Sequence, residues 1–204
     1  MRSSGFLTLT AALAFAALMA STTESCGRGD STEAAVPRPE GFPRIERYDS
    51  VYHPLDSVPV RFEVNDSAVI VPSKPGRDGD TWVTLAYPRY GGARLFLTFT
   101  PTTPASLPAV LDNRAERMAL NTGGARSELI ELVSDGGFSG RLMTTRSSTV
   151  TPLQFLASDP HGSMVVSGAL FIGDAAEASS PDSLTPVVDA VRDDLLHALK
   201  HLSL

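Results

Sequence analysis

The chain has 204 residues, a formal net charge of −6 and a single cysteine. Its length suits one domain of ordinary size with a sizeable core. A mildly acidic chain without a basic run is a poor binder of nucleic acid, and one cysteine excludes an internal disulfide or a zinc site built from cysteines.

The first residues, MRSSGFLTLTAALAFAALMASTTES, are typical of a secretory signal peptide. Arg2 gives a positive start, and residues 6–20 form a run without charge. Spanning a bilayer takes about 20 apolar residues, so this run is short for a permanent membrane helix. A buried core helix would show polar residues on one face, whereas this run contains only small and apolar residues with two threonines. We therefore predict that residues 1–25 are a signal peptide.

Cys26 follows this segment directly, and two cleavage sites compete. Ordinary cleavage would fall among residues 20–23, whereas lipoprotein processing would cut between Ser25 and Cys26 after the thiol receives diacylglycerol. Thr23 and Glu24 depart from the usual lipobox, which has leucine three residues before the cysteine. An unpaired surface thiol is a liability in an oxidising compartment, which favours lipidation of Cys26.

Residues 26–39 contain little that could be buried, which is typical of a flexible tether. The tripeptide RGD at 28–30 is too short a motif to predict adhesion. Folded sequence is predicted over residues 40–204 as a single domain. No second apolar segment approaches spanning length, so any membrane attachment is predicted to come through Cys26.

Alternating apolar and polar residues predict β-strands in the first part of this domain. In residues 58–64 the side chains predicted to share one face are Val60, Phe62 and Val64. A short apolar stretch at 68–72 predicts the next strand, and the glycine- and aspartate-rich residues 73–80 predict a loop.

Residues 81–88 and 93–100 predict a β-hairpin, because the RYGG sequence between them is rich in turn-forming glycine. The second of these strands has two distinct faces. Its two predicted sets are Leu95, Leu97 and Phe99 on one face, and Arg94, Phe96 and Thr98 on the other.

The apolar period then changes to that of a helix. The predicted buried face consists of Leu107, Val110, Leu111, Ala115 and Met118. Ser106 is predicted to cap the start of this helix, and the NTGG sequence at 121–124 to end it.

Strand patterns resume over 127–133, 140–146, 152–158 and 163–172. A final helix is predicted to begin at Ser183 or Thr185, with Pro186 in its first turn. Its apolar stripe comprises Leu184, Val187, Val188, Val191, Leu195, Leu199 and Leu202. Strands that do not alternate with helices predict the α+β class, with a mainly antiparallel sheet and two packed helices.

The sequence SDPHGS places Ser158, Asp159, His161 and Ser163 close together. Triad members usually come from separate elements, and the chain has no GxSxG sequence. Asp-Pro-His-Gly between two strand patterns is typical of a hairpin turn. The turn is therefore the favoured interpretation, and a hydrolase using Asp159 or His161 ranks last among the functions considered.

His197 and His201 lie one helical turn apart, a spacing that can hold a metal, but no glutamate accompanies them as in HExxH. Basic residues in a last turn also interact favourably with the helix dipole. His53 has no obvious partner, and Asp193 and Asp194 are predicted to form a solvated helix face. GxxxxGK and GxGxxG are absent from the sequence. We predict no metal, no cofactor and no enzymatic activity.

Three groups of residues then carry a family resemblance. The first contains Gln154, Phe155 and Asp159, the second is GALF at 168–171, and the third contains Asp182, Ser183, Pro186 and Val187. PRPEGFPRI at 37–45, which contains Arg38 and Arg44, and WVTLAYPRY at 82–90 extend the match. In this spacing the chain resembles the GldD family of gliding motility lipoproteins.

This resemblance implies an exported lipoprotein whose first mature residue, Cys26, is acylated. It implies a cell-envelope component that faces the periplasm and supports gliding motility and the type IX secretion apparatus through protein partners, without catalysis. The order of elements is also similar to a PsbP-like α+β sandwich. The candidate partner surface comprises Arg38, Arg44, Gln154, Asp159, Asp182 and Ser183. The alternative is a module that binds a small ligand or cell-wall fragment in a cleft between sheet and helix.

Overall fold

The computed structural model describes residues 45–47, 49–56, 58–71, 76, 79–146, 151–173 and 181–204, without the side chains of 181–183. All of them belong to the unit Phe42–Leu204. The predicted signal peptide, the predicted tether and Cys26 lie outside the described residues.

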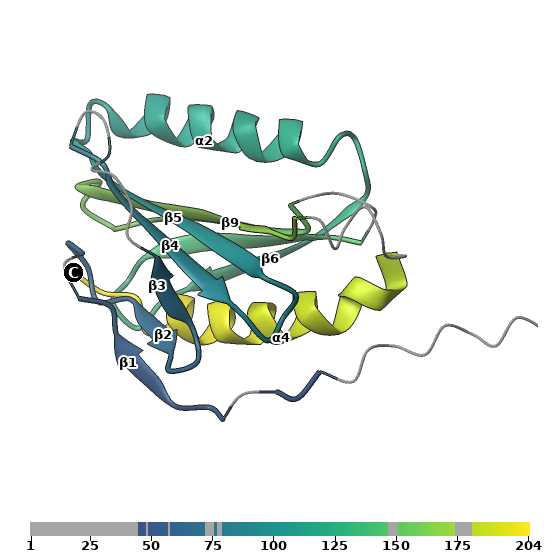
Figure 1. Cartoon of the computed structure of the whole chain (residues 1–204). Helices are drawn as coiled ribbons and strands as arrows, with labels where there is room; N and C mark the ends of the chain where they lie inside the picture. The colour runs from purple at the N-terminus through teal and green to yellow at the C-terminus, as the bar shows by residue number, and fades with distance from the viewer. Residues whose placement is uncertain are drawn as a thin grey trace, which may run out of the picture. The chain divides into compact units, whose positions relative to one another are not determined.

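Nine strands and two helices are described (Figure 1). The strands are β1 (Tyr52–Pro54), β2 (Glu63–Asn65), β3 (Val69–Val71), β4 (Thr81–Tyr87), β5 (Ala93–Pro101), β6 (Ser127–Val133), β7 (Ser139–Thr145), β8 (Leu153–Ser158) and β9 (Met164–Phe171). The helices are α2 (Leu107–Asn121) and α4 (Pro181–Lys200).

Seven strands form one antiparallel sheet in the order β3-β4-β5-β9-β8-β7-β6, and β1 pairs separately with β2. Helix α2 lies on one face of the sheet and α4 on the other, as Figure 1 shows. The β1–β2 pair lies beside α4. The predicted α+β class, with an antiparallel sheet and two packed helices, is confirmed.

The main core lies between the sheet and α4. In β5, Leu95, Leu97 and Phe99 are at most 1% exposed and belong to this core, whereas Phe96 on the opposite face is 44% exposed. The predicted inward face of residues 58–64 is likewise buried. Alternation along these strands therefore predicted their buried faces correctly, because successive side chains point to opposite sides of a strand.

Helix α4 buries its predicted stripe, and Leu195 and Leu199 are at most 1% exposed. The helix begins at Pro181, earlier than predicted, so that Pro186 lies inside it. Pro181 takes the first helical position, where the missing N–H of proline costs no hydrogen bond. No helix in the described part of the chain is long and apolar enough to cross a membrane.

A smaller apolar cluster joins α2 to the other face of the sheet, where Leu107, Val110, Leu111 and Met118 pack on the sheet as predicted. Ser106, however, does not cap the helix with its side chain. Thr103 and Ser106 instead bond reciprocally, each hydroxyl accepting the other's backbone N–H at 3.2 and 3.0 Å. The hydrogen-bonded turn that leads into α2 therefore begins at Thr103.

Candidate functional site

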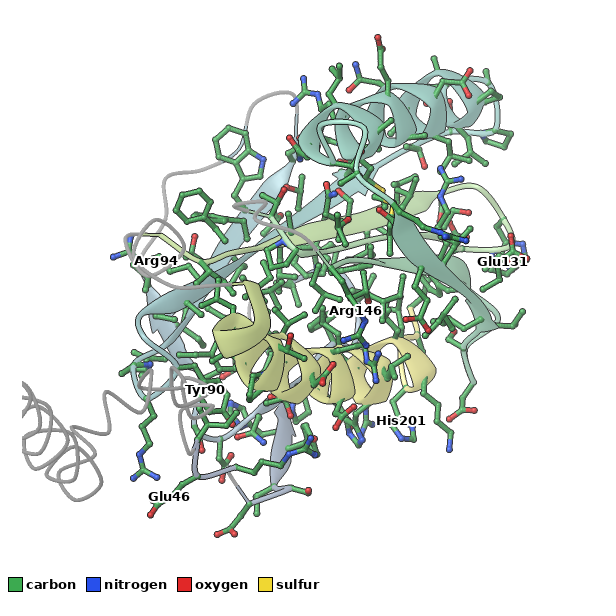
Figure 2. All side chains as sticks on the ribbon, turned by 90° about the vertical axis from the view of Figure 1, so that its right-hand side faces the viewer. Glu46, Tyr90, Arg94, Glu131, Arg146 and His201 are labelled. Carbon is green, nitrogen blue, oxygen red and sulfur yellow. The ribbon has the colours of Figure 1, made fainter. Side chains whose placement is uncertain are left out.

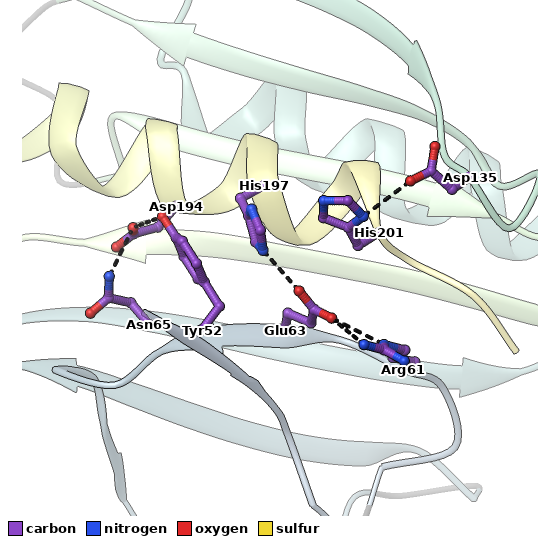
Figure 3. A network of polar contacts seen from close by, with 8 residues as sticks. All are labelled: Tyr52, Arg61, Glu63, Asn65, Asp135, Asp194, His197 and His201. Atoms are coloured by element: carbon purple, nitrogen blue, oxygen red, sulfur yellow. Dashed lines mark hydrogen bonds and ion pairs between the residues drawn. The ribbon is translucent and has the colours of Figure 1, made fainter. Parts of the chain in front are cut away.

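Polar side chains fill the boundary between α4 and the β1–β2 pair (Figure 3). They come from elements far apart in the sequence. We call this set the α4–β2 polar network, and its members are Tyr52, Arg61, Glu63, Asn65, Asp135, Asp194, His197 and His201.

His197 has the carboxylate partner that the local sequence did not reveal. Its Nε2 atom lies 2.8 Å from Oε2 of Glu63, and its ring stacks on Tyr52 with centroids 3.7 Å apart. Arg61 donates from Nε and Nη2 to Oε1 of Glu63 at 3.0 and 2.6 Å. The Arg61 hydrogen bonds, followed by the His197 contact, lower the pKa of Glu63 below its usual value. Glu63 is thus held as a carboxylate between Arg61 and His197.

Asp194 is the second acidic centre of the network. Tyr52 donates to its Oδ1 atom at 2.9 Å, and Asn65 Nδ2 makes a longer contact of 3.5 Å. Burial raises the pKa of Asp194 although these two hydrogen bonds oppose the shift, and burial together with Asp194 raises the pKa of Tyr52 to about 12. The prediction that Asp193 and Asp194 both face solvent is therefore wrong for Asp194. Asp193 is exposed and pairs with Arg47 at 2.9 Å.

His201, the residue directly after α4, completes the network, with its ring centroid 4.6 Å from that of His197. Its Nδ1 atom lies 3.0 Å from Oδ2 of Asp135, which belongs to the β6–β7 turn. A hollow of about 280 Å³ opens beside this pair. Within the described residues, no group of three or more histidine, cysteine or acidic side chains is arranged to hold a metal ion.

These contacts connect the C-terminal part of α4 to neighbouring elements. His197 and His201 each contact a carboxylate from another element, and Tyr52 joins β1 to α4. His53, for which the sequence suggested no partner, lies 2.6 Å from Asp66 just after β2. Hydrogen bonds and ring stacking therefore hold the β1–β2 pair to the helix.

Replacing Asp194 by asparagine is expected to make folding less sensitive to rising pH. The raised pKa means that the folded chain binds this proton more tightly than the unfolded chain, whose aspartates titrate near about 3.9. This stabilisation is present below that pH and is lost as the pH rises through the folded-state pKa. Asparagine keeps the accepting oxygen without the charge. Urea unfolding at about pH 4 and about pH 8 should show Asp194→Asn gaining stability relative to the parent at the higher pH.

Asp193→Asn is the matched control, since this exposed neighbour forms only a surface ion pair with Arg47. It should retain most of the pH dependence of the parent, because the Asp193 charge contributes less than burial to the raised pKa of Asp194. If Asp194→Asn instead loses more stability relative to the parent at the higher pH, the ionised carboxylate would be stabilising the α4–β2 polar network.

Gln154, from the predicted partner surface, is 1% exposed. Its Oε1 atom accepts a hydrogen bond from Asn121 at 3.0 Å, and its Nε2 atom donates to the carbonyl of Met118 at 3.3 Å. Gln154 therefore ties the end of α2 to strand β8, because a buried amide is stabilised only when its polar atoms are paired.

Asp159, at the other end of β8, is 3% exposed. Its carboxylate accepts from the backbone N–H of His161, Ser163 and Met164 at 2.9, 2.7 and 2.6 Å, and from the Ser163 hydroxyl at 3.2 Å. Burial acts to raise the pKa of Asp159, but these hydrogen bonds bring it below the usual value. The predicted hairpin turn is confirmed, and Asp159 organises it.

The predicted partner surface is accordingly corrected at its two central residues, since side chains this deeply buried cannot contact a partner in this conformation. Arg38 and Arg44 lie outside the described residues. Asp182 and Ser183 lie in the first turn of α4, and their side chains are likewise outside the description.

A groove of about 770 Å³ lies between α2 and the face of strands β6, β7 and β8. Leu111 and Ala115 form its helix wall, and Leu156 lies in its floor. Arg141 is half-buried there and makes no ion pair with any described residue. This is a cleft between sheet and helix of the kind that the sequence analysis considered for ligand binding, although the sequence did not place it.

Comparison with known families adds one finding. A family model described as gliding motility lipoprotein GldD matches residues 32–204, which include every residue that the structure describes. The match begins within the predicted tether, after Cys26. No match to the chain was found among curated proteins.

Proposed function

The chain belongs to the GldD family of gliding motility lipoproteins, and we propose that it serves the cell envelope as a non-enzymatic accessory component of the gliding motility and type IX secretion apparatus. The observation that carries the proposal is the family match over residues 32–204. The protein is exported, anchored through Cys26 and faces the periplasm.

The anchoring part of the proposal is supported by the order of segments at the N-terminus. An apolar run with a positive start precedes the single cysteine, and a polar stretch follows it. Each acyl methylene buried in a bilayer contributes about 0.8 kcal/mol, so that two chains hold a soluble domain stably where one is marginal.

Cys26→Ser is therefore expected to move the protein from the membrane pellet to the soluble fraction. The serine cannot receive the thioether-linked lipid. Fractionation of cells followed by a carbonate wash measures this directly. Ser31→Ala in the predicted tether is the control and should remain in the pellet. A Cys26→Ser protein that stays membrane-bound after the wash would contradict lipid anchoring at this residue.

The accessory role is supported by the way in which the ionisable groups of the α4–β2 polar network pair with one another. His197 with Glu63, His201 with Asp135, and Tyr52 with Asp194 join separate elements, which is a structural use of these groups. Affinity capture of the tagged protein from detergent-solubilised envelope tests the role. We expect stoichiometric recovery of motility or secretion proteins, and capture of the protein alone would contradict it.

A second candidate function, a module that binds a small ligand or cell-wall fragment, is favoured by the groove and its half-buried Arg141. Mass spectrometry of the purified protein would detect a bound glycan or peptide. Ala115→Trp fills the groove and should abolish such binding. Ala109→Trp, at an exposed position of the same helix that does not line the groove, should leave it intact.

A further inference from the structure

Apolar side chains are exposed on the α2 side of the sheet, over strands β3, β4, β5 and β9. Val69, Trp82, Phe96 and Phe171 are 52%, 40%, 44% and 37% exposed. We call these four residues the aromatic patch. Their common orientation follows from the pairing register, because directly paired residues share a face of the sheet.

The register also places Trp82 and Phe171 on diagonal positions next to Phe96, whereas Val69 lies two strands away from Phe96 on β3. Phe96 is paired with Thr84 on β4 and with Ala169 on β9, so its direct neighbours are small. Phe171 lies diagonally across from Phe96, and the two rings contact edge to face with centroids 6.3 Å apart. Trp82, paired with Thr98, lies on the other diagonal. The aromatic side chains are therefore exposed because the residues paired with Phe96 and Trp82 are small.

Exposed arginines border the patch although the whole chain carries −6. Arg94 is exposed and is paired directly with Phe171, and Figure 2 shows its side chain pointing outward. Arg117 of α2 is exposed and lines a small hollow together with Phe96. The α2-side positions within β3, β4, β5 and β9 include no acidic residue, and Asp80, just before β4, is paired with Arg114 of α2 at 3.2 Å.

We propose that the aromatic patch docks on an anionic membrane surface and inserts its rings at the headgroup level. Tryptophan and other amphipathic aromatic side chains favour the boundary between water and lipid, and arginine is attracted to anionic headgroups. A patch bordered by two exposed arginines, whose neighbouring Asp80 is already paired with Arg114, matches this surface. The inference rests on the envelope location in the proposed function but does not need the anchor itself to be acylated.

The sequence predicts a flexible tether between Cys26 and the domain. A flexible chain that spans the positions from Cys26 to Ile45 has a root-mean-square span of roughly 25 Å. A linker of that length would keep the patch at an effective concentration of about millimolar near the bilayer. Weak contacts by a few rings and two arginines are then sufficient to orient the domain.

The experiment uses the single cysteine and the single tryptophan of the chain. The mature chain, residues 26–204, is coupled through Cys26 to maleimide lipid in vesicles of phosphatidylethanolamine and phosphatidylglycerol. Coupling replaces acylation, so the result is independent of whether Cys26 is lipidated in cells. We expect Trp82 emission to shift to shorter wavelength, to be quenched by brominated lipid and to lose its quenching by acrylamide.

Phe96→Ser should remove most of the quenching by brominated lipid, and Arg94→Glu should do the same by reversing the charge at the rim. Leu120→Ser, at a 72% exposed position on α2, is the control and should change nothing. Arg94→Glu keeps the test valid if Phe96→Ser loses its thermal transition. Equal acrylamide quenching of the coupled and free parent would overturn the proposal. Protection of Trp82 only after addition of solubilised envelope proteins would also overturn it, and would identify a protein interface.

Discussion

Leu195→Asp is expected to abolish folding. Leu195 is 1% exposed in the stripe that α4 buries against the sheet. Removing such a side chain from the core loses about 1.5–3 kcal/mol of burial, and the aspartate adds an unpaired buried charge. Because a domain of this size is stable by only about 5–15 kcal/mol, the folded state should no longer be populated. Circular dichroism during heating would show no cooperative transition.

Leu204→Asp is the matched control, because it makes the same substitution at a leucine that is 63% exposed. It should melt as the parent does. A cooperative transition of Leu195→Asp near the parent's temperature would show that α4 is not packed on the sheet as described.

Asp159→Ala should cause the second largest loss. The substitution removes a buried carboxylate that accepts three backbone hydrogen bonds in the β8–β9 turn. Hydrogen bonds to a charged group contribute about 1.5–3 kcal/mol each but are not additive, so a total loss of about 3 kcal/mol is expected. In a domain of this size that corresponds to a decrease in melting temperature of roughly 5–10 °C.

The same residue should impose a pH dependence of the opposite sign to that of Asp194. Since the pKa of Asp159 is lowered by folding, its stabilisation is present above the unfolded value of about 3.9 and is lost as the pH falls through the folded-state pKa. The difference in stability between the parent and Asp159→Asn should therefore shrink below about pH 4.

His161→Ala is the control for the turn, because this side chain is exposed beside Asp159. It should leave the melting temperature nearly unchanged. If Asp159→Ala instead melts like the parent but no longer captures an envelope protein, the partner-surface role predicted from the sequence would stand.

Local periodicity explains how much of the fold was predictable. The inward faces of β5 and of residues 58–64, and the stripe of α4, follow from alternation and helical spacing alone. Gln154 and Asp159 were assigned to a partner surface from the family resemblance, whereas the turn role of Asp159 follows from its local sequence. Gln154 can be buried because its amide pairs with the Asn121 side chain and the Met118 carbonyl, a long-range arrangement that no short stretch encodes.

The α4–β2 polar network could not be predicted from any short stretch. Glu63 and His197 are separated by 134 positions, and nothing local encodes their pairing. One signal was nonetheless present, since Glu63 occupies the outward position between buried Phe62 and Val64. An outward acidic residue on a short strand and histidines on the flank of a helical stripe are candidates for pairing once the strand is known to lie beside that helix.

The central place of β9 determines when the sheet can form as the chain is made. Strands β3, β4 and β5 form one half-sheet and β6, β7 and β8 the other, and β9 alone joins them. Until residue 171 has emerged, each half-sheet has an unpaired edge, and the chain lacks both its middle strand and α4. We expect such long-range closure to delay folding until synthesis is almost complete. Truncation before Met164 should therefore yield two unlinked half-sheets rather than a smaller stable domain.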